Sequence, residues 1–160
     1  MQGETGNRMR PATLRDLALE TAEAHRGLWY SWGGDDPAQG FDCSGLIVEI
    51  MKTCGLIARQ ADMTASGIYQ MLAKNGKSLQ SASGPGCLAF WGATAKPDMI
   101  YHVEMIWVGL DGKWFSIGAS GGTSKTVTRE DAMRDNAFIK VRPVDGRGGY
   151  VFFADPFIGG

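Results

Sequence analysis

Cys43 has the surroundings of a reactive thiol. It stands in the run Phe41-Asp42-Cys43-Ser44-Gly45-Leu46, directly ahead of an apolar stretch with helical spacing. At a helix start, unpaired backbone N–H groups and the positive end of the helix dipole favour the thiolate, which is the nucleophilic form of cysteine. A free cysteine is also a common core residue, but the polar neighbours Asp42 and Ser44 indicate a loop-to-helix junction. We therefore expect Cys43 to be a nucleophile with a lowered pKa.

A nucleophilic thiol needs a base within hydrogen-bond reach. The chain offers two histidines, His25 in an amphipathic segment and His102 at the start of an apolar one. A lone histidine in either place is more often structural than catalytic, so residue type and position alone do not choose between them.

The other two cysteines read as core residues. Cys54 lies 11 residues beyond Cys43, which is about 16 Å along a helix, too far to share a site. Cys87 stands in an apolar run. A bridge between Cys54 and Cys87 stays open. Without a CxxC pair, and with few histidines, the sequence predicts no metal site.

The composition is that of a globular protein of 160 residues, with 44% hydrophobic and 21% charged residues and a net charge of −1. That charge gives no case for a nucleic-acid partner, and no apolar run reaches the roughly 20 residues of a membrane span. Residues 1–10 are polar and do not resemble a secretory signal. We expect a flexible arm at residues 1–11 and one catalytic domain at residues 12–160.

Helices are predicted in the first half of the chain. Thr13, with Asp16 three residues later, is typical of an N-cap before a helix over residues 13–26. A second helix is expected from Cys43 to a stop at Gly55, and a shorter one over residues 66–74. Glycines and Pro37 between residues 33 and 40 indicate a loop.

Strands are predicted in the second half, over residues 87–91, 101–110, 114–117 and 138–141. Asp111-Gly112 is a strong hairpin signal between the second and third of these. A helical turn is expected at residues 129–136, and little regular structure in the aromatic tail of residues 146–160. Helices followed by antiparallel strands indicate an α+β fold with the N-terminal helices packed on a central antiparallel sheet.

The chain resembles the NlpC-type cell-wall peptidases, a family of papain-like cysteine endopeptidases. The resemblance rests on motifs in the family's order, spread over about residues 13–145: Tyr30-Ser31-Trp32-Gly33-Gly34, Phe41-Asp42-Cys43-Ser44-Gly45-Leu46, Gly84-Pro85-Gly86-Cys87-Leu88-Ala89-Phe90, His102-Val103-Glu104 and Gly118-Ala119-Ser120. It implies a papain-like fold and hydrolysis of peptidoglycan stem peptides at bonds such as D-γ-glutamyl-diamino acid.

The resemblance also implies roles for particular residues. Cys43 would be the nucleophile and His102 the general base, passing through an acyl-enzyme without a metal or organic cofactor. Tyr30 would help form the oxyanion site together with the backbone N–H of Cys43. Asp42 and Ser44 match positions that hold the amino end of the stem peptide in some members.

Two positions depart from the family pattern. Cys87 stands where an aspartate is usual, which we expect to affect packing more than chemistry. Gly118 stands at the third catalytic position, where a polar residue, often histidine, orients the base. The sequence leaves the substitute open among a backbone carbonyl, a water and three side chains: Ser120, Ser116 and Glu104. Glu104 shares a strand face with His102, but residues two apart on a strand are about 6.5–7 Å from each other, and a neighbouring arginine or lysine is an equally good partner.

Other functions stay open as well. The same Cys/His pair would serve an amidase or an acyltransferase, and Gly118 would also suit a catalytically decayed phage structural module. The run Gly118-Ala119-Ser120-Gly121-Gly122 is similar to phage- and prophage-associated members. With no signal or membrane insertion expected, we predict action on the cell wall after lysis or delivery by a phage tail or secretion machine.

Overall fold

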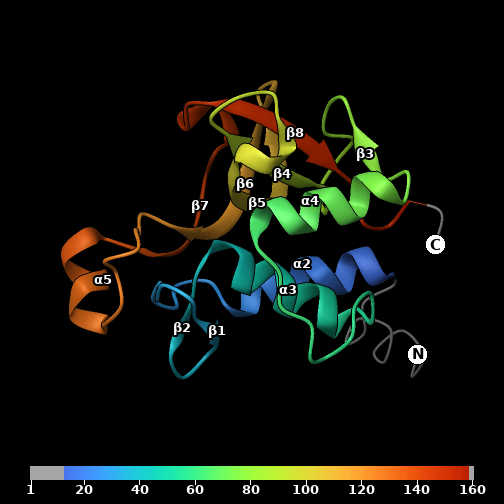
Figure 1. Cartoon of the computed structure of the whole chain (residues 1–160). Coiled ribbons are helices and arrows are strands. Elements are labelled where there is room, and N and C mark those ends of the chain that lie inside the picture. The colour runs from blue at the N-terminus through green and yellow to red at the C-terminus, as the bar shows by residue number, and fades with distance from the viewer. Residues whose placement is uncertain (1–12, 159–160) are drawn as a thin grey trace, which may run out of the picture.

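The computed structural model describes residues 13–158 (Figure 1), so the arm expected at residues 1–11 lies outside the described residues. The predicted helices are confirmed close to their expected ends. Thr13 caps the first one, its Oγ1 accepting from the backbone N–H of Asp16 at 3.0 Å. The helices are α2 (Leu14–Ala24), α3 (Cys43–Thr53), α4 (Ala65–Lys74) and α5 (Arg129–Asp135). The longest have 11 residues, and none in the described range is long and apolar enough to cross a bilayer.

A six-stranded antiparallel sheet forms the other layer, in the order β3-β8-β4-β5-β6-β7. Asp111 and Gly112 both have positive φ (53° and 76°) in the β5–β6 hairpin, as the sequence predicted. The strands are β3 (Ser78–Leu79), β4 (Leu88–Gly92), β5 (Ile100–Leu110), β6 (Lys113–Ser120), β7 (Phe138–Pro143) and β8 (Tyr150–Ala154). A separate hairpin, β1 (Asp35–Asp36) and β2 (Gly40–Phe41), occupies the predicted loop.

The tail is the main correction to the sequence prediction. Residues 150–154, expected to lack regular structure, form β8, which pairs along the full length of β4 from Leu88↔Ala154 to Gly92↔Tyr150. The glycines and prolines that argued against a strand lie on either side of it. Apolar residues of this segment lie beside β4. The segment is therefore a strand because it pairs with β4, and no local sequence signal reveals that pairing.

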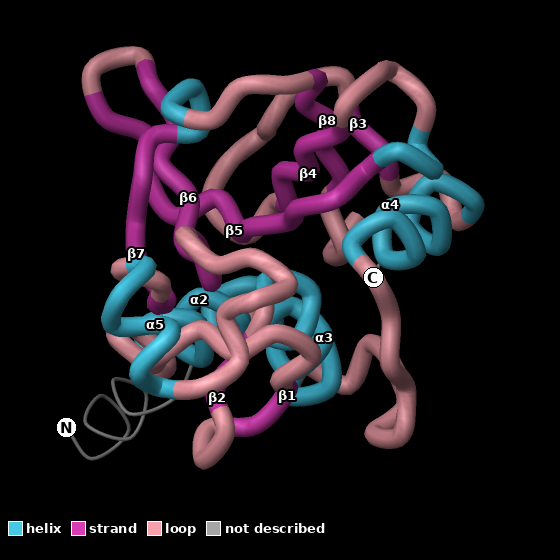
Figure 2. Tube along the Cα trace, turned by 60° about the vertical axis from the view of Figure 1, so that its left-hand side comes forward, coloured by secondary structure: helices cyan, strands magenta, loops and turns pink. Residues whose placement is uncertain are grey.

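The sheet and helices meet in one apolar core (Figures 1 and 2), with α2 and α3 lying together along one side of the sheet. Alternate strand residues point to it, among them Phe90, Val103 and Met105. Residues between them, such as Ala89 and Trp91, belong to a second cluster. The α+β architecture, with N-terminal helices packed on an antiparallel sheet, is confirmed. His102 and Glu104 alternate with Val103 and Met105 and therefore share the face of Trp91.

Phe152 tests the contribution of β8. Phe152 is 9% exposed, and the centroid of its ring lies 5.0 Å from the ring centroid of Tyr69. Phe152→Ala is expected to lower the free energy of unfolding by about 3–5 kcal/mol, because it leaves a cavity between β8 and α4. Unfolding in urea measures this change in the free energy of unfolding. Leu110→Ala, at a side chain 55% exposed, is the control and should change stability by no more than about 0.5 kcal/mol. Equal effects of the two substitutions would contradict this account of β8.

Candidate active site

Asp42 fixes the position of Cys43 at the first residue of α3. Its Oδ1 accepts a 2.7 Å hydrogen bond from the backbone N–H of Gly45, and its Oδ2 accepts one of 3.0 Å from the N–H of Gly33. Ser44 Oγ also donates to Oδ1 at 3.4 Å. The carboxylate therefore caps the helix and ties the preceding loop to its first turn.

Gly45 allows this loop to touch the helix directly. A Cβ on Gly45 would lie only 2.2 Å from the carbonyl oxygen of Gly34. That oxygen accepts from the backbone N–H of Asp42 at 3.1 Å. Backbone thus packs on backbone, which explains the glycine at position 45. Gly34 has a similar reason, since a Cβ there would lie 2.3 Å from the carbonyl oxygen of Gly40.

Cys43 faces the beginning of β5. Its Sγ is 3.9 Å from the carbonyl oxygen of Tyr101, to which the thiol donates. A cavity of about 580 Å³ opens here, and Cys43 and His102 both line it. Three other residues singled out in the sequence line the same cavity, namely Tyr30, Asp42 and Ser44. The fold therefore brings the segment of Tyr30, the start of α3 and the start of β5 together around one cavity.

The ring of His102 is held from the side by a buried carboxylate. His102 Nε2 lies 2.7 Å from Glu104 Oε2, and Ser116 Oγ donates to Glu104 Oε1 at 2.7 Å. The ring also lies 5.4 Å from that of Trp91. The separation expected along the strand is closed by the side chains, which lean toward each other on one face.

Ser120, another candidate partner of His102, is instead engaged by two arginines. Its Oγ accepts from Arg147 Nη2 at 2.9 Å and from Arg142 Nη1 at 3.3 Å. Both guanidinium groups line the cavity. Sequence reasoning missed them, because Arg142 is an ordinary strand residue and Arg147 lies in the glycine-rich tail. Only the tertiary fold brings them to the cavity that Cys43 lines.

Tyr30 is buried in the cavity wall against Gly122, where a Cβ would lie 2.3 Å from the tyrosine ring. Burial, and secondarily the negative charge of Asp42, raises the pKa of Tyr30. Its hydroxyl thus stays protonated and is a potential donor at neutral pH.

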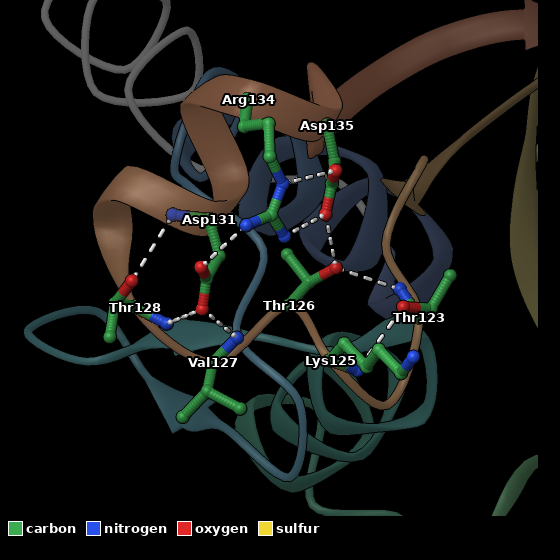
Figure 3. Close-up of polar contacts among 8 residues, drawn as sticks. All are labelled: Thr123, Lys125, Thr126, Val127, Thr128, Asp131, Arg134 and Asp135. Atoms are coloured by element: carbon green, nitrogen blue, oxygen red, sulfur yellow. Dashed lines mark hydrogen bonds and ion pairs between the residues drawn. The ribbon is translucent and has the colours of Figure 1, made fainter.

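The segment after Gly122 is braced by its own polar contacts (Figure 3). Thr126 is buried, accepts from the backbone N–H of Thr123 at 2.9 Å and donates to Asp135 at 2.8 Å. Its carbonyl oxygen accepts from the backbone N–H of Trp32 at 2.7 Å. A capping box between Thr128 and Asp131 starts α5. Together these contacts tie the loop that carries Gly122 to the segment that carries Tyr30.

The protonation states correct a prediction from the sequence. Burial raises the pKa of the Cys43 thiol to about 12 and the charge of Asp42 adds to it, outweighing the backbone N–H groups of Val103 and Ser44. The expected lowering by the helix start is therefore wrong in direction. Burial also lowers the pKa of His102, although Glu104 acts in the opposite sense. The resting site holds a neutral thiol and a neutral imidazole.

The other two cysteines are buried and, like Cys43, free thiols. Cys54 Sγ lies 3.5 Å from the carbonyl oxygen of Leu14, and Cys87 Sγ lies 3.1 Å from Ser83 Oγ. The bridge that the sequence left open is therefore not formed. Cys87 is fully buried, in keeping with a packing role. Within residues 13–158, no three His, Cys, Asp or Glu side chains gather as metal ligands would.

Alkylation of Cys43 by iodoacetamide tests the raised pKa. We expect the rate to keep rising up to at least about pH 10, because the thiolate is the reactive form and the pKa is about 12. Mass spectrometry of the separate peptides distinguishes Cys43 from Cys54 and Cys87. Asp42→Asn removes a charge that raises this pKa and should shift the profile to lower pH. A wild-type rate that levels off below pH 8 would contradict the prediction.

The sequence and the fold have counterparts among known proteins. The chain is 29% identical over 106 residues to the bifunctional muramidase/DL-endopeptidase CwlT of Bacillus subtilis strain 168; the match covers 66% of this chain and 30% of CwlT. The chain thus spans less than a third of that relative.

Two solved structures share the fold. The NlpC/p60 domain of the peptidoglycan hydrolase SagA superposes with a TM-score of 0.55 at 25% identity, covering 88% of this chain and 97% of that one. RipD of Mycobacterium tuberculosis, described as a non-catalytic NlpC/p60 domain protein adapted to peptidoglycan binding, gives 0.56 at 20% identity, covering 89% and 96%.

The sequence model of the NlpC/P60 family matches residues 27–142. This range begins just before Tyr30 and ends at Arg142, so it takes in Cys43, His102 and Glu104. On this match, which covers most of the described fold, the chain belongs to the NlpC/P60 family.

Proposed function

We propose that the chain is a cysteine endopeptidase that cleaves peptidoglycan stem peptides. The observation that carries this proposal is the shared cavity, in which Cys43 at a helix start and His102 on β5 line one space. Membership of the NlpC/P60 family and the likeness to CwlT, whose name includes a DL-endopeptidase, support the proposal.

His102 has the state that a general base needs. An ionised carboxylate only accepts hydrogen bonds, so the 2.7 Å contact with Glu104 Oε2 assigns the ring proton to Nε2. Nδ1 then keeps its lone pair. Since the lowered pKa leaves His102 neutral, Nδ1 is available to take the proton of the Cys43 thiol as the thiol attacks.

The proposed reaction has two halves. Cys43 Sγ bonds to the substrate carbonyl carbon while its proton passes to His102, and Tyr30 with the Cys43 N–H stabilises the oxyanion. His102 then gives the proton to the leaving amine, and the C–N bond breaks to leave a thioester. A water, deprotonated by His102, attacks the thioester, and the proton returns to the sulfur as the acid product leaves.

The arginines support a substrate with a carboxylate near the scissile bond. Arg142 and Arg147 line the cavity and share Ser120 Oγ, and each guanidinium keeps further N–H donors for a ligand. A D-glutamyl residue linked through its γ-carboxyl keeps a free α-carboxylate, which guanidinium groups bind well. We therefore assign the scissile bond to D-γ-glutamyl-diamino acid. Asp42 and Ser44, on another part of the wall, would hold the amino end of the peptide.

Loss of either reacting group should abolish cleavage. Cys43→Ala and His102→Ala are each expected to stop the release of stem-peptide fragments from purified cell wall, because one removes the nucleophile and the other its base. Cys54→Ala and His25→Ala are the matched controls and should keep activity. Mass spectrometry identifies the products: amidase action would separate the lactyl group from L-alanine, and an acyltransferase would join the acyl group to an amine. Full activity of Cys43→Ala would overturn the assignment, and no activity in the wild type would favour a decayed module.

The arginines make a separate prediction about substrate choice. Arg142→Ala and Arg147→Ala should each raise KM about 10-fold or more for stem peptides with a free D-glutamyl α-carboxylate, because a charge-assisted hydrogen bond is lost. The same peptides amidated at that carboxyl should show less than about a 2-fold change. Lys140→Ala is the control, since Lys140 Nζ donates to the carbonyl oxygen of Asn136 and Lys140 does not line the cavity. Equal losses on both peptides would refute carboxylate recognition.

The proposed place of action is the bacterial cell wall. Delivery after lysis, or by a phage tail or secretion machine, stays a prediction from the resemblance of residues 118–122 to phage-associated members. Detection of the protein in purified particles by immunoblot would support the phage route.

A further inference from the structure

We propose that Glu104 is the positioning residue of His102, and that Gly118 is a glycine because the Glu104 side chain occupies the space of a side chain there. This inference rests on the proposed function, since it names the group that orients the proposed base. It places that group on the same strand as the base, β5, rather than on the neighbouring strand β6.

Glu104 has the contacts of a group dedicated to the imidazole. It is only 2% exposed, and an unpaired buried carboxylate is strongly unfavourable. One carboxylate oxygen lies 2.7 Å from His102 Nε2, and the other accepts a hydrogen bond from Ser116 Oγ, also at 2.7 Å. Arg147 Nη2 is farther, at 3.9 Å from Oε2. The closest partners are thus the imidazole and a hydroxyl that fixes the carboxylate from behind.

Gly118 makes this arrangement possible. It follows Ile117, which pairs with Met105, so the antiparallel register brings residue 118 opposite Glu104. A Cβ on Gly118 would lie 2.4 Å from Glu104 Cγ and 2.9 Å from Cδ. Real Cβ atoms do not approach other atoms so closely, so a side chain at position 118 and the observed Glu104 conformation exclude each other.

The remaining candidates for the orienting role have other partners. Ser120 accepts from Arg142 and Arg147, and Ser116 contacts Glu104. Ser116 therefore acts through Glu104. Gly118 on β6 leaves the expected position of the orienting group without a side chain. Glu104 on the neighbouring strand β5 takes over that role.

A conservative substitution separates positioning from structure. Glu104→Gln keeps the volume and one oxygen acceptor but loses the charge. We expect kcat to fall at least about 100-fold, the scale of general acid–base catalysis, with KM changed less than about 3-fold. Glu104 raises the pKa of His102, so its loss should also move the acid limb of kcat/KM to lower pH. The charged groups acting on the ring from other elements, Arg142 and Arg147, are unchanged in this variant. So are the titratable groups Tyr30, Asp42 and Cys43, which line the same cavity.

A swap between the strands gives the sharper test. Gly118→Asp alone should inactivate the enzyme, because its Cβ overlaps Glu104. In a Glu104→Ala background the same substitution should raise activity at least about 10-fold over Glu104→Ala, since the introduced carboxylate starts close to the present position of Glu104 Cγ. The opposite sign in the two backgrounds is the expected result. Circular dichroism and urea unfolding confirm that each variant is folded. If both backgrounds show a loss, or if Glu104→Gln keeps the wild-type kcat and pH profile, the inference is wrong.

One readout is independent of cleavage. Nuclear magnetic resonance titration of His102, in wild type and Glu104→Gln, should show a lower imidazole pKa in the variant. If the wild type cleaves no peptidoglycan, the proposed function fails, while this titration still decides whether Glu104 and His102 are coupled. An unchanged pKa would overturn the inference even in an active enzyme.

Discussion

The Asp42 carboxylate is the contact on which the site depends. It binds the N–H groups of Gly33 and Gly45, so a loop and a helix start are joined through one side chain. Cys43 lies in sequence between these two anchors, and its Sγ is 3.9 Å from the carbonyl oxygen of Tyr101 at the start of β5. The same charge that fixes the thiol also disfavours its ionisation. The contact that positions the proposed nucleophile thus also lowers its resting reactivity, and in the proposed reaction the His102 imidazole would offset this by taking the thiol proton.

The charged side chains of the cavity surround two uncharged groups, the Cys43 thiol and the His102 imidazole. The thiol and the imidazole are both uncharged at rest, whereas Asp42, Glu104, Arg142 and Arg147 carry the charges around them. In the proposed reaction no preformed ion pair is needed, because the ionic state would arise only as the thiol attacks. Glu104 would then stabilise the imidazolium, and Tyr30, kept protonated by burial, would donate to the oxyanion.

Local sequence signals predicted the elements that are formed by local interactions. The caps at Thr13 and Asp42, the positive-φ pair Asp111-Gly112 and the alternation in β5 are all encoded within a few residues, so helices, hairpin and the α+β class could be predicted. β8 could not, because its partner β4 lies some 60 residues earlier. The direction of the Cys43 pKa failed for a related reason, since the helix start is a local feature and burial is a tertiary one.

The candidate site was predictable to a similar extent. Cys43 and His102 follow from motifs, but Arg142 and Arg147 reach the cavity only through the packing of the last third of the chain. The sequence does not distinguish Glu104 as the partner of His102 from Glu104 as the partner of a nearby arginine or lysine, because backbone spacing does not show how two side chains are oriented. Gly118 had the clearest signal, an absence of a side chain, and only the position of Glu104 explains it.

The insertion of β8 between β3 and β4 also bears on how the chain is made. On a ribosome, β4, β5 and β6 emerge and can pair in turn, while one edge of β4 waits for residues 150–154. Until these appear, the backbone groups of β4 on that side and the apolar ring of Phe90 lack their β8 partners, a state prone to intermolecular pairing. The nascent chain is therefore most exposed to aggregation after β6 has paired and before residues 150–154 emerge, and a chain truncated before residue 150 would leave β4 as an open edge.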